Sequence, residues 1–152
     1  MLNEEIRGSI EESVLCWLAT VSNAGEPNVS PKEMFAPYKN KYLLIANIAS
    51  PVSVQNIENN SKVCVSFIEI FKQKGFKLGG IAYNLIEGDE DYEEKVALLR
   101  HLGGDGFPIK GVIQIEITSV SPIIAPSYWL YPDQTTESSQ IEQSLKTYGV
   151  RK

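Results

Sequence analysis

The residues best suited to ligand chemistry fall in two short polar clusters. The first is residues 30–33, Ser-Pro-Lys-Glu, and the second runs from Asn47 through Ser50 to Ser53. A lysine supplies a compact positive charge, serines supply hydroxyl groups, and the start of a helix offers backbone N–H groups without helical partners. If the two clusters lie side by side, they form a site for an anionic ligand.

Each cluster lies at the end of a predicted strand. Residues 28–35 are predicted to form one strand, in which Pro31 removes a hydrogen-bond donor and favours an edge or a locally irregular position. Residues 42–46 form a strongly apolar strand that stops at an asparagine. Ser50-Pro51 then suits the cap and first position of a short helix that ends near Glu58.

The first part of the chain predicts a helix followed by a central strand. Residues 15–21 are almost continuously apolar, which is typical of a strand covered on both sides, and the turn-forming residues 23–27 place it in a hairpin. The preceding residues have the period of an amphipathic helix. Its inward stripe is predicted to be Leu2, Ile6, Ile10, Ser13 and Val14.

The second half predicts three more strands and a helix. Residues 63–67 alternate in polarity, residues 71–87 contain a long strand with a bend or bulge at Gly79-Gly80, and residues 112–118 alternate again. Between the last two strands, a helix is predicted from about residue 89 to residue 102. Its buried stripe would be Tyr92, Val96 and Leu99.

The residues from about 122 to 152 have a different composition. They form an aromatic- and proline-rich arm that includes Trp129, and residues 135–148 have the spacing of a terminal helix. Aromatic surface outside a core usually marks an interface or a ligand site.

These elements predict one domain, residues 1–152, that is mainly β with flanking helices (α+β). Six strands joined mostly by turns favour a closed or nearly closed antiparallel barrel. No Gly-x-Gly-x-x-Gly segment follows a strand, which argues against a nucleotide-binding parallel sheet.

Composition excludes several classes of partner. The net charge of −5 argues against binding nucleic acid or an anionic membrane, even though Lys72, Lys74 and Lys77 lie near two phenylalanines. No apolar run reaches membrane-spanning length and no secretory signal is present, so we expect a cytoplasmic protein. The two cysteines and the single histidine are not spaced as metal ligands.

Five segments, taken together and in order, resemble the pyridoxamine 5'-phosphate oxidase-like, FMN-binding split-barrel family. They are LATV at residues 18–21, GEPNVSP at 25–31, LLIAN at 43–47, IENNSKV at 57–63 and GFKLGGIA at 75–82. The resemblance covers roughly residues 10 to 120. It implies a homodimer of six-stranded antiparallel split barrels, with one FMN in each crevice between the subunits.

The resemblance also implies where FMN would bind. The phosphate would contact residues 30–33 and 50–54, with Lys74 as a second cationic candidate, while Trp129 in the arm would reach the flavin of the partner subunit. The candidate cofactor-binding residues are therefore Ser30, Pro31, Lys32, Glu33, Asn47, Ser50, Val52, Ser53, Val54, Lys74 and Trp129. Each has a structural alternative: an exposed charge pair, a helix cap or interface packing.

Two departures from the family pattern bear on the activity. Val52-Ser53 stands where pyridoxamine phosphate oxidases usually carry an Arg-Lys pair, and their arginine-containing C-terminal substrate motif is absent. No residue is indicated as a catalytic acid or base. We therefore expect an FMN-binding oxidoreductase with a small-molecule or nicotinamide electron donor. The alternatives are a non-catalytic module for flavin, deazaflavin or haem, and a ligand-free interaction protein.

Overall fold

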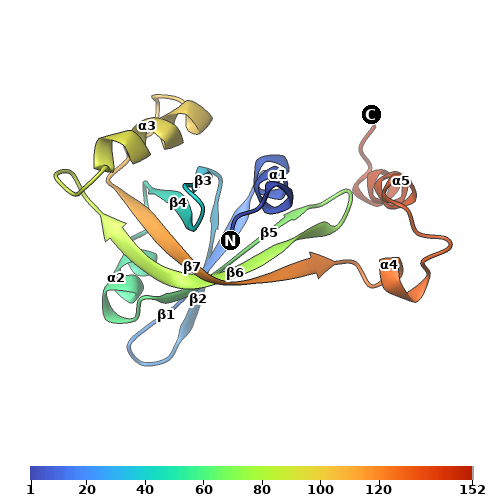
Figure 1. Ribbon diagram of the computed structural model, residues 1–152, viewed down its shortest axis with the longest axis horizontal. Coiled ribbons are helices and arrows are strands. Elements are labelled where there is room, and N and C mark those ends of the chain that lie inside the picture. Colours follow the sequence, from blue (N-terminus) through green and yellow to red (C-terminus); the bar gives the residue numbers. More distant parts are fainter. Residues whose placement is uncertain (152) are drawn as a thin grey trace.

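The computed structural model describes residues 1–151. Seven strands form one sheet in the order β2-β1-β5-β6-β7-β4-β3, and all neighbouring strands are antiparallel. The strands are β1 (Cys16–Val21), β2 (Pro27–Lys32), β3 (Phe35–Tyr38), β4 (Tyr42–Asn47), β5 (Lys62–Glu69), β6 (Lys74–Leu85) and β7 (Gly111–Ile124). The helices are α1 (Glu4–Glu12), α2 (Pro51–Asn59), α3 (Tyr92–Gly103), α4 (Ser127–Leu130) and α5 (Glu137–Tyr148). Figure 1 shows the sheet curled around α1.

The α+β antiparallel split-barrel prediction is confirmed, with seven strands in place of six. The extra strand arises because the predicted strand 28–35 is two strands, β2 and β3, separated by Glu33 and Met34. These strands form the two opposite edges of the sheet, so the chain crosses between the edges at this point. The Met34 carbonyl already accepts a hydrogen bond from the Ala46 N–H of β4, at 2.9 Å. The edge position predicted from Pro31 is correct.

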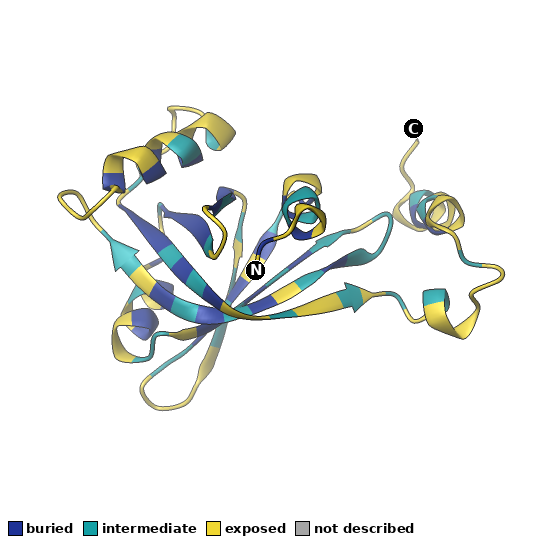
Figure 2. Ribbon diagram, viewed as in Figure 1, coloured by how far each residue is buried: buried dark blue, intermediate teal, exposed yellow. Residues whose placement is uncertain are grey.

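Strand β4 is buried on both faces, which explains its continuous apolar sequence. Leu43 and Ile45 belong to the main core inside the curled sheet, where Ile6 and Ile10 of α1 also pack. Leu44, on the opposite face, belongs to a second cluster under α3. Figure 2 shows the buried residues concentrated along the middle of the sheet. The predicted stripe of α3 is confirmed, because Tyr92, Val96 and Leu99 are all buried in that second cluster.

The bulge predicted at Gly79-Gly80 is also present. Gly79 lies opposite Ser119 and Gly80 lies opposite Ile117, so the extra residue is Thr118 of β7. The Thr118 hydroxyl donates to the Gly79 carbonyl at 3.2 Å. A Cβ at Gly80 would lie 2.5 Å from the Glu116 carbonyl oxygen, so only glycine fits at this bend.

Helix α1 is shorter than its apolar period predicts. It ends at Glu12 because Ser13 is extended, with its hydroxyl donating to the Ser9 carbonyl at 2.7 Å. Val14 therefore leaves the helical stripe and is 79% exposed. The prediction that Val14 faces the core is wrong.

The C-terminal arm lies at the opposite end of the molecule from α3 (Figure 1). Strand β7 continues to Ile124, beyond its predicted end at residue 118, and the short helix α4 was not predicted. The arm is held by the turn between β5 and β6. Tyr128 donates to the Lys72 carbonyl at 2.8 Å and Ser144 donates to the Phe71 carbonyl at 2.9 Å. Within residues 1–151, no helix is both long and apolar enough to cross a bilayer.

Candidate functional site

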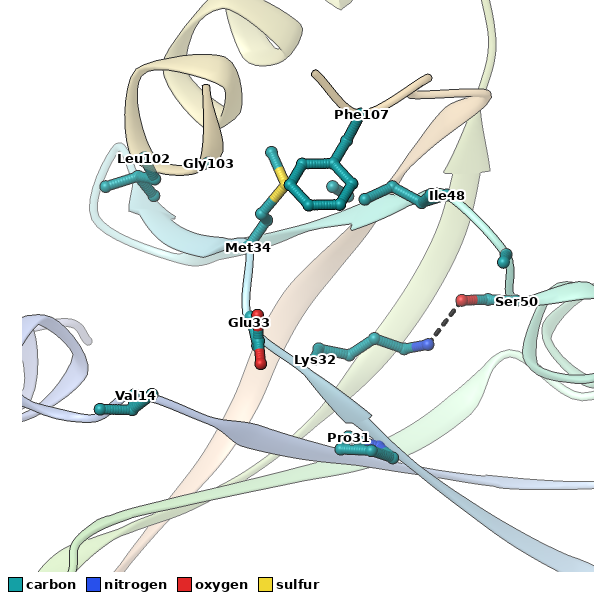
Figure 3. A pocket seen from close by; sticks show the side chains of 12 residues that line it. Val14, Pro31, Lys32, Glu33, Met34, Ile48, Ser50, Leu102, Gly103 and Phe107 are labelled. Carbon is teal, nitrogen blue, oxygen red and sulfur yellow. Dashed lines mark hydrogen bonds between the residues drawn. The ribbon is translucent and has the colours of Figure 1, made fainter. Parts of the chain in front are cut away.

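The two polar clusters meet although their strands are not neighbours. Strand β2 pairs with β1, whereas β4 pairs with β3 and β7. Lys32, the last residue of β2, nevertheless reaches Ser50, which precedes α2, and its Nζ donates to the Ser50 Oγ at 2.5 Å (Figure 3). The curl of the sheet, and not strand pairing, brings the clusters together.

Lys32 and Ser50 border a cavity of about 530 Å³. Pro31 and Glu33 of the predicted set also line it. Met34 and Ile48 form an apolar wall, and Leu102, Gly103 and Phe107, at and beyond the end of α3, complete it (Figure 3). The volume lies within the usual range for small-molecule sites, about 300–1,000 Å³.

The Lys32 ammonium group is partly buried and has no carboxylate partner among residues 1–151. None of the ion pairs formed by residues 1–151 includes it, although Lys39, Lys41, Lys72, Lys74 and Lys146 all pair with carboxylates. Burial lowers the pKa of Lys32 below its usual value of 10.5. A charge in this position is stabilised by an anion, because removing a cation from water without a counterion is unfavourable.

Cys16 lies opposite Lys32 in the pairing of β1 with β2 and is fully buried. Burial raises the pKa of its thiol to about 12, although the positive charge of Lys32 acts in the opposite direction. The thiol is therefore protonated at neutral pH and is not a nucleophile. No group of metal-binding side chains occurs among residues 1–151.

Helix α2 presents its N-terminus beside Lys32. Ser50 is the cap residue, but its hydroxyl makes no capping hydrogen bond and instead accepts from Lys32. The first N–H groups of the helix have no partner in the preceding turn and are available to an anion. Asn56 holds the helix in place, because its side-chain amide donates to the buried Thr20 hydroxyl at 3.0 Å.

Lys74 and Trp129 are not brought to this cavity by a single chain. The Lys74 Nζ lies 2.8 Å from the Glu137 carboxylate and 4.6 Å from the centre of the Tyr128 ring. Lys74 borders a separate cavity of about 420 Å³, which shares no lining residue with the first. Trp129, on α4, is 64% exposed.

Comparison with known proteins identifies the family. The profile described as pyridoxamine 5'-phosphate oxidase matches residues 2–123. The chain belongs to this family. The match contains all seven strands except Ile124, the last residue of β7, together with Lys32, Ser50 and α2, whereas α4 and α5 lie beyond it. A comparison with curated proteins gives no match.

Solved structures share the fold of this pyridoxamine 5'-phosphate oxidase family member. HupZ from Group A Streptococcus is 23% identical, with a TM-score of 0.69 over 82% of this chain and 99% of that chain. An FMN-binding protein from Syntrophomonas wolfei is 16% identical, with a TM-score of 0.70 over 82% and 87% of the two chains. HutZ, the heme storage protein from Vibrio cholerae, is 21% identical, with a TM-score of 0.63 over 81% and 94%.

The remaining predicted residues lie near the cavity without lining it. Ser30 is two positions before Lys32 on β2, so both side chains are on the same face of the sheet. In α2, Ser53 is buried and Val52 is exposed, while Val54 packs against the main core. Asn47 is buried at the end of β4, where its amide donates to Asn84 at 3.3 Å.

Sequence reasoning missed most of the apolar wall of the site in this family member. The missed residues are Val14, Met34, Ala46, Leu102, Gly103 and Phe107, whereas Ile48 and Ala49 lie within the second predicted cluster. Gly103, the last residue of α3, permits close packing, since a Cβ there would collide with the side chain of Met34. Met34 itself interrupts the predicted strand. No local pattern joins it to the end of α3, which lies far along the chain.

Proposed function

We propose that this protein binds FMN, with the phosphate in the Lys32 cavity. The observation that carries the proposal is the partly buried Lys32 ammonium, which contacts a serine hydroxyl and forms no ion pair with a carboxylate of residues 1–151. Its position next to the N-terminus of α2 combines a full positive charge with unpaired N–H groups. Both features suit a phosphate, and family membership supports FMN as the molecule that carries it.

The proposed site differs from that of a pyridoxamine phosphate oxidase. Val52 and Ser53 occupy the first turn of α2, where the resemblance predicts an Arg-Lys pair in such oxidases. Val52 is an uncharged, exposed side chain and Ser53 offers only a small hydroxyl. Lys32 would thus be the main cation for the phosphate, and oxidation of a vitamin precursor is not the proposed activity.

The proposed assembly is a homodimer in which a partner subunit completes each flavin crevice. Lys74 and Trp129 are candidates for this contribution, because neither reaches Lys32 within its own chain. The outer face of the sheet carries exposed Trp17 on β1 and Tyr83 on β6, which supply apolar surface for a second copy.

The proposed activity is electron transfer. Bound FMN would supply the hydride and electron chemistry, and a small organic molecule or a nicotinamide nucleotide would be the donor. The part of this chain is to hold the phosphate at Lys32 and to exclude water with the apolar wall around Met34 and Phe107. The neutral Cys16 thiol takes no part as a nucleophile.

Haem binding is the alternative, because one of the matching structures is a heme storage protein. The single histidine, His101, is exposed in the last turn of α3, next to Leu102 and Gly103 of the cavity wall. A His101→Ala variant separates the two ligands. FMN binding should be unaffected, whereas a haem held by this histidine would lose that side chain as a ligand and change its absorption spectrum.

The deciding experiment is a visible spectrum of the purified protein before and after addition of FMN. A flavin spectrum, with release of FMN on denaturation and a molecular mass of two chains, supports the proposal. A colourless protein that does not bind added FMN overturns it. Reduction of the bound flavin by NADH or NADPH under anaerobic conditions would then separate an enzyme from a flavin carrier.

A further inference from the structure

A second hollow continues the Lys32 cavity along the outside of the barrel. It has a volume of about 470 Å³ and lies between α1, β3 and α3. Val14, Glu33 and Leu102 line both hollows, so the two share a common wall and form one groove. Lys32 is at one end of this groove, and Phe35, Pro37 and Leu98 line the other.

The walls of the groove are apolar and open to solvent. Val14 and Leu102 project at the junction of the two hollows, where Leu102 is 56% exposed, and Phe107 is 51% exposed on the Lys32 side. Large apolar side chains gathered at the mouth of a hollow are unfavourable in water, and covering them with an apolar ligand removes that cost.

The charges of the groove disfavour an anion beyond Lys32. Glu33 lies at the junction, and Glu11 lies farther along on α1. Among residues 1–151, Arg7 is the only cation that lines the outer hollow, and its guanidinium already donates to the carbonyls of Leu2 and Lys39 and to the side chain of Asn40. A negatively charged ligand would therefore meet two carboxylates and one occupied guanidinium, whereas an uncharged ligand meets no such barrier.

We infer that the outer hollow of this groove, bounded by Val14, Glu33, Leu98 and Leu102, binds an apolar, uncharged aromatic molecule. Because the outer hollow adjoins the Lys32 cavity, we assign this molecule as the substrate of the flavin site. This role rests on the proposed function. The binding itself does not depend on flavin. The two hollows of the groove thus bind different groups. The cavity at Lys32 binds an anion, and the outer hollow between α1 and α3 binds an uncharged apolar ring.

The test uses two fluorescent probes with the same ring system. N-phenyl-1-naphthylamine is uncharged, and 8-anilino-1-naphthalenesulfonate adds a sulfonate. The titrations are made on the flavin-free full chain and on its Lys32→Met variant, which removes the cation of the adjoining cavity. In this variant the uncharged probe should bind at least about tenfold more tightly than the sulfonate. Adding Glu33→Gln to it removes a carboxylate that repels the sulfonate, so the difference in affinity between the two probes should become smaller.

Matched variants test whether the uncharged probe contacts the wall that the two hollows share. Leu102→Ser should weaken its binding about tenfold, and Val14→Ser should act in the same direction, because each removes apolar area from the groove. Ile86→Ser is the control, since Ile86 is exposed to nearly the same degree, 55%, but lines neither hollow. Equal effects of Leu102→Ser and Ile86→Ser would overturn the inference.

Absence of uncharged-probe binding to the native chain would also overturn the inference, and would indicate that another part of the assembly covers the groove. A separate FMN titration keeps the two proposals apart. If the uncharged probe binds in the groove but FMN does not bind, the inference of an apolar binding site is kept, and the proposals of FMN binding and of a substrate role are rejected. If FMN binds and the probe does not, FMN binding is kept and the apolar binding site is rejected.

Discussion

The Nζ of Lys32 and the Oγ of Ser50 are joined by a hydrogen bond, although the two residues are 18 positions apart and Ser50 follows β4, a strand that does not pair with β2. The contact fixes the ammonium beside the N-terminus of α2. Because no carboxylate of residues 1–151 pairs with it, this charge is free to bind an anion.

Replacing Lys32 with methionine tests this role directly. Lys32→Met should weaken FMN binding about 10- to 100-fold, because a charged hydrogen bond contributes about 1.5–3 kcal/mol. Quenching of flavin fluorescence during titration measures the affinity. Lys62→Met is the control: Lys62 is exposed on β5, forms no ion pair with residues 1–151 and does not line the cavity. Equal affinity in the two variants would place the phosphate elsewhere.

The lowered pKa of Lys32 predicts how FMN affinity depends on pH. The phosphate needs the protonated ammonium, so affinity is retained below the pKa of Lys32 and is lost as the pH rises through it. Burial lowers that pKa, and the loss should therefore begin at a lower pH than for an exposed lysine. Lys32→Arg keeps its charge at high pH and should move the loss upward.

The measurement is the ratio of the two affinities across the alkaline range. Ionisation of the flavin affects both proteins equally and cancels in this ratio. Measurements above about pH 7 also keep the phosphate in its dianionic form. A ratio that does not change with pH would show that the Lys32 charge does not contribute to binding.

The parts of the site that could be predicted from the sequence are those formed by residues close together in the chain. The two polar clusters were identified because strand ends and helix starts leave local signals, such as Ser50-Pro51. The passage of the chain between the two sheet edges at Met34, and the part of the cavity wall formed by Gly103 and Phe107, depend on contacts between segments far apart in the chain. Sequence periodicity carries no information about such contacts.

The fold itself was predictable to a similar extent. The buried face of α3 and the bulge at Gly79-Gly80 follow from local composition, and both are present. Val14 was misplaced because its spacing continues the helical stripe, whereas the hydroxyl of Ser13 bonds to the Ser9 carbonyl and the chain becomes extended. Side-chain bonds of this kind compete with the helix at its end.

Close packing of glycine predicts an order of stability among alanine variants. Gly80→Ala should cost about 1–3 kcal/mol, because the new Cβ would meet the backbone oxygen of Glu116 at 2.5 Å, which can move only with β7. Gly103→Ala should cost less, since the atoms it meets belong to the flexible side chain of Met34.

Urea unfolding of the three proteins measures these costs. Gly106→Ala serves as the reference, because a Cβ at Gly106 meets no atom within 4 Å. The midpoint should fall in the order Gly106→Ala, Gly103→Ala, Gly80→Ala. A Gly80→Ala protein as stable as the reference would contradict the tight packing of the bulge.

The docking of α5 depends on one buried hydroxyl, and this gives a local prediction. Ser144 is buried and donates to the Phe71 carbonyl in the turn between β5 and β6. Ser144→Ala leaves that carbonyl unpaired, at a cost of about 1 kcal/mol, so amide hydrogen exchange in α5 should accelerate about fivefold. The β4 amides should be unaffected, because β4 lies away from α5 in the molecule (Figure 1). Ser138→Ala, an exposed change in the same helix, is the control, and equal acceleration in both variants would show that this hydrogen bond does not hold the arm.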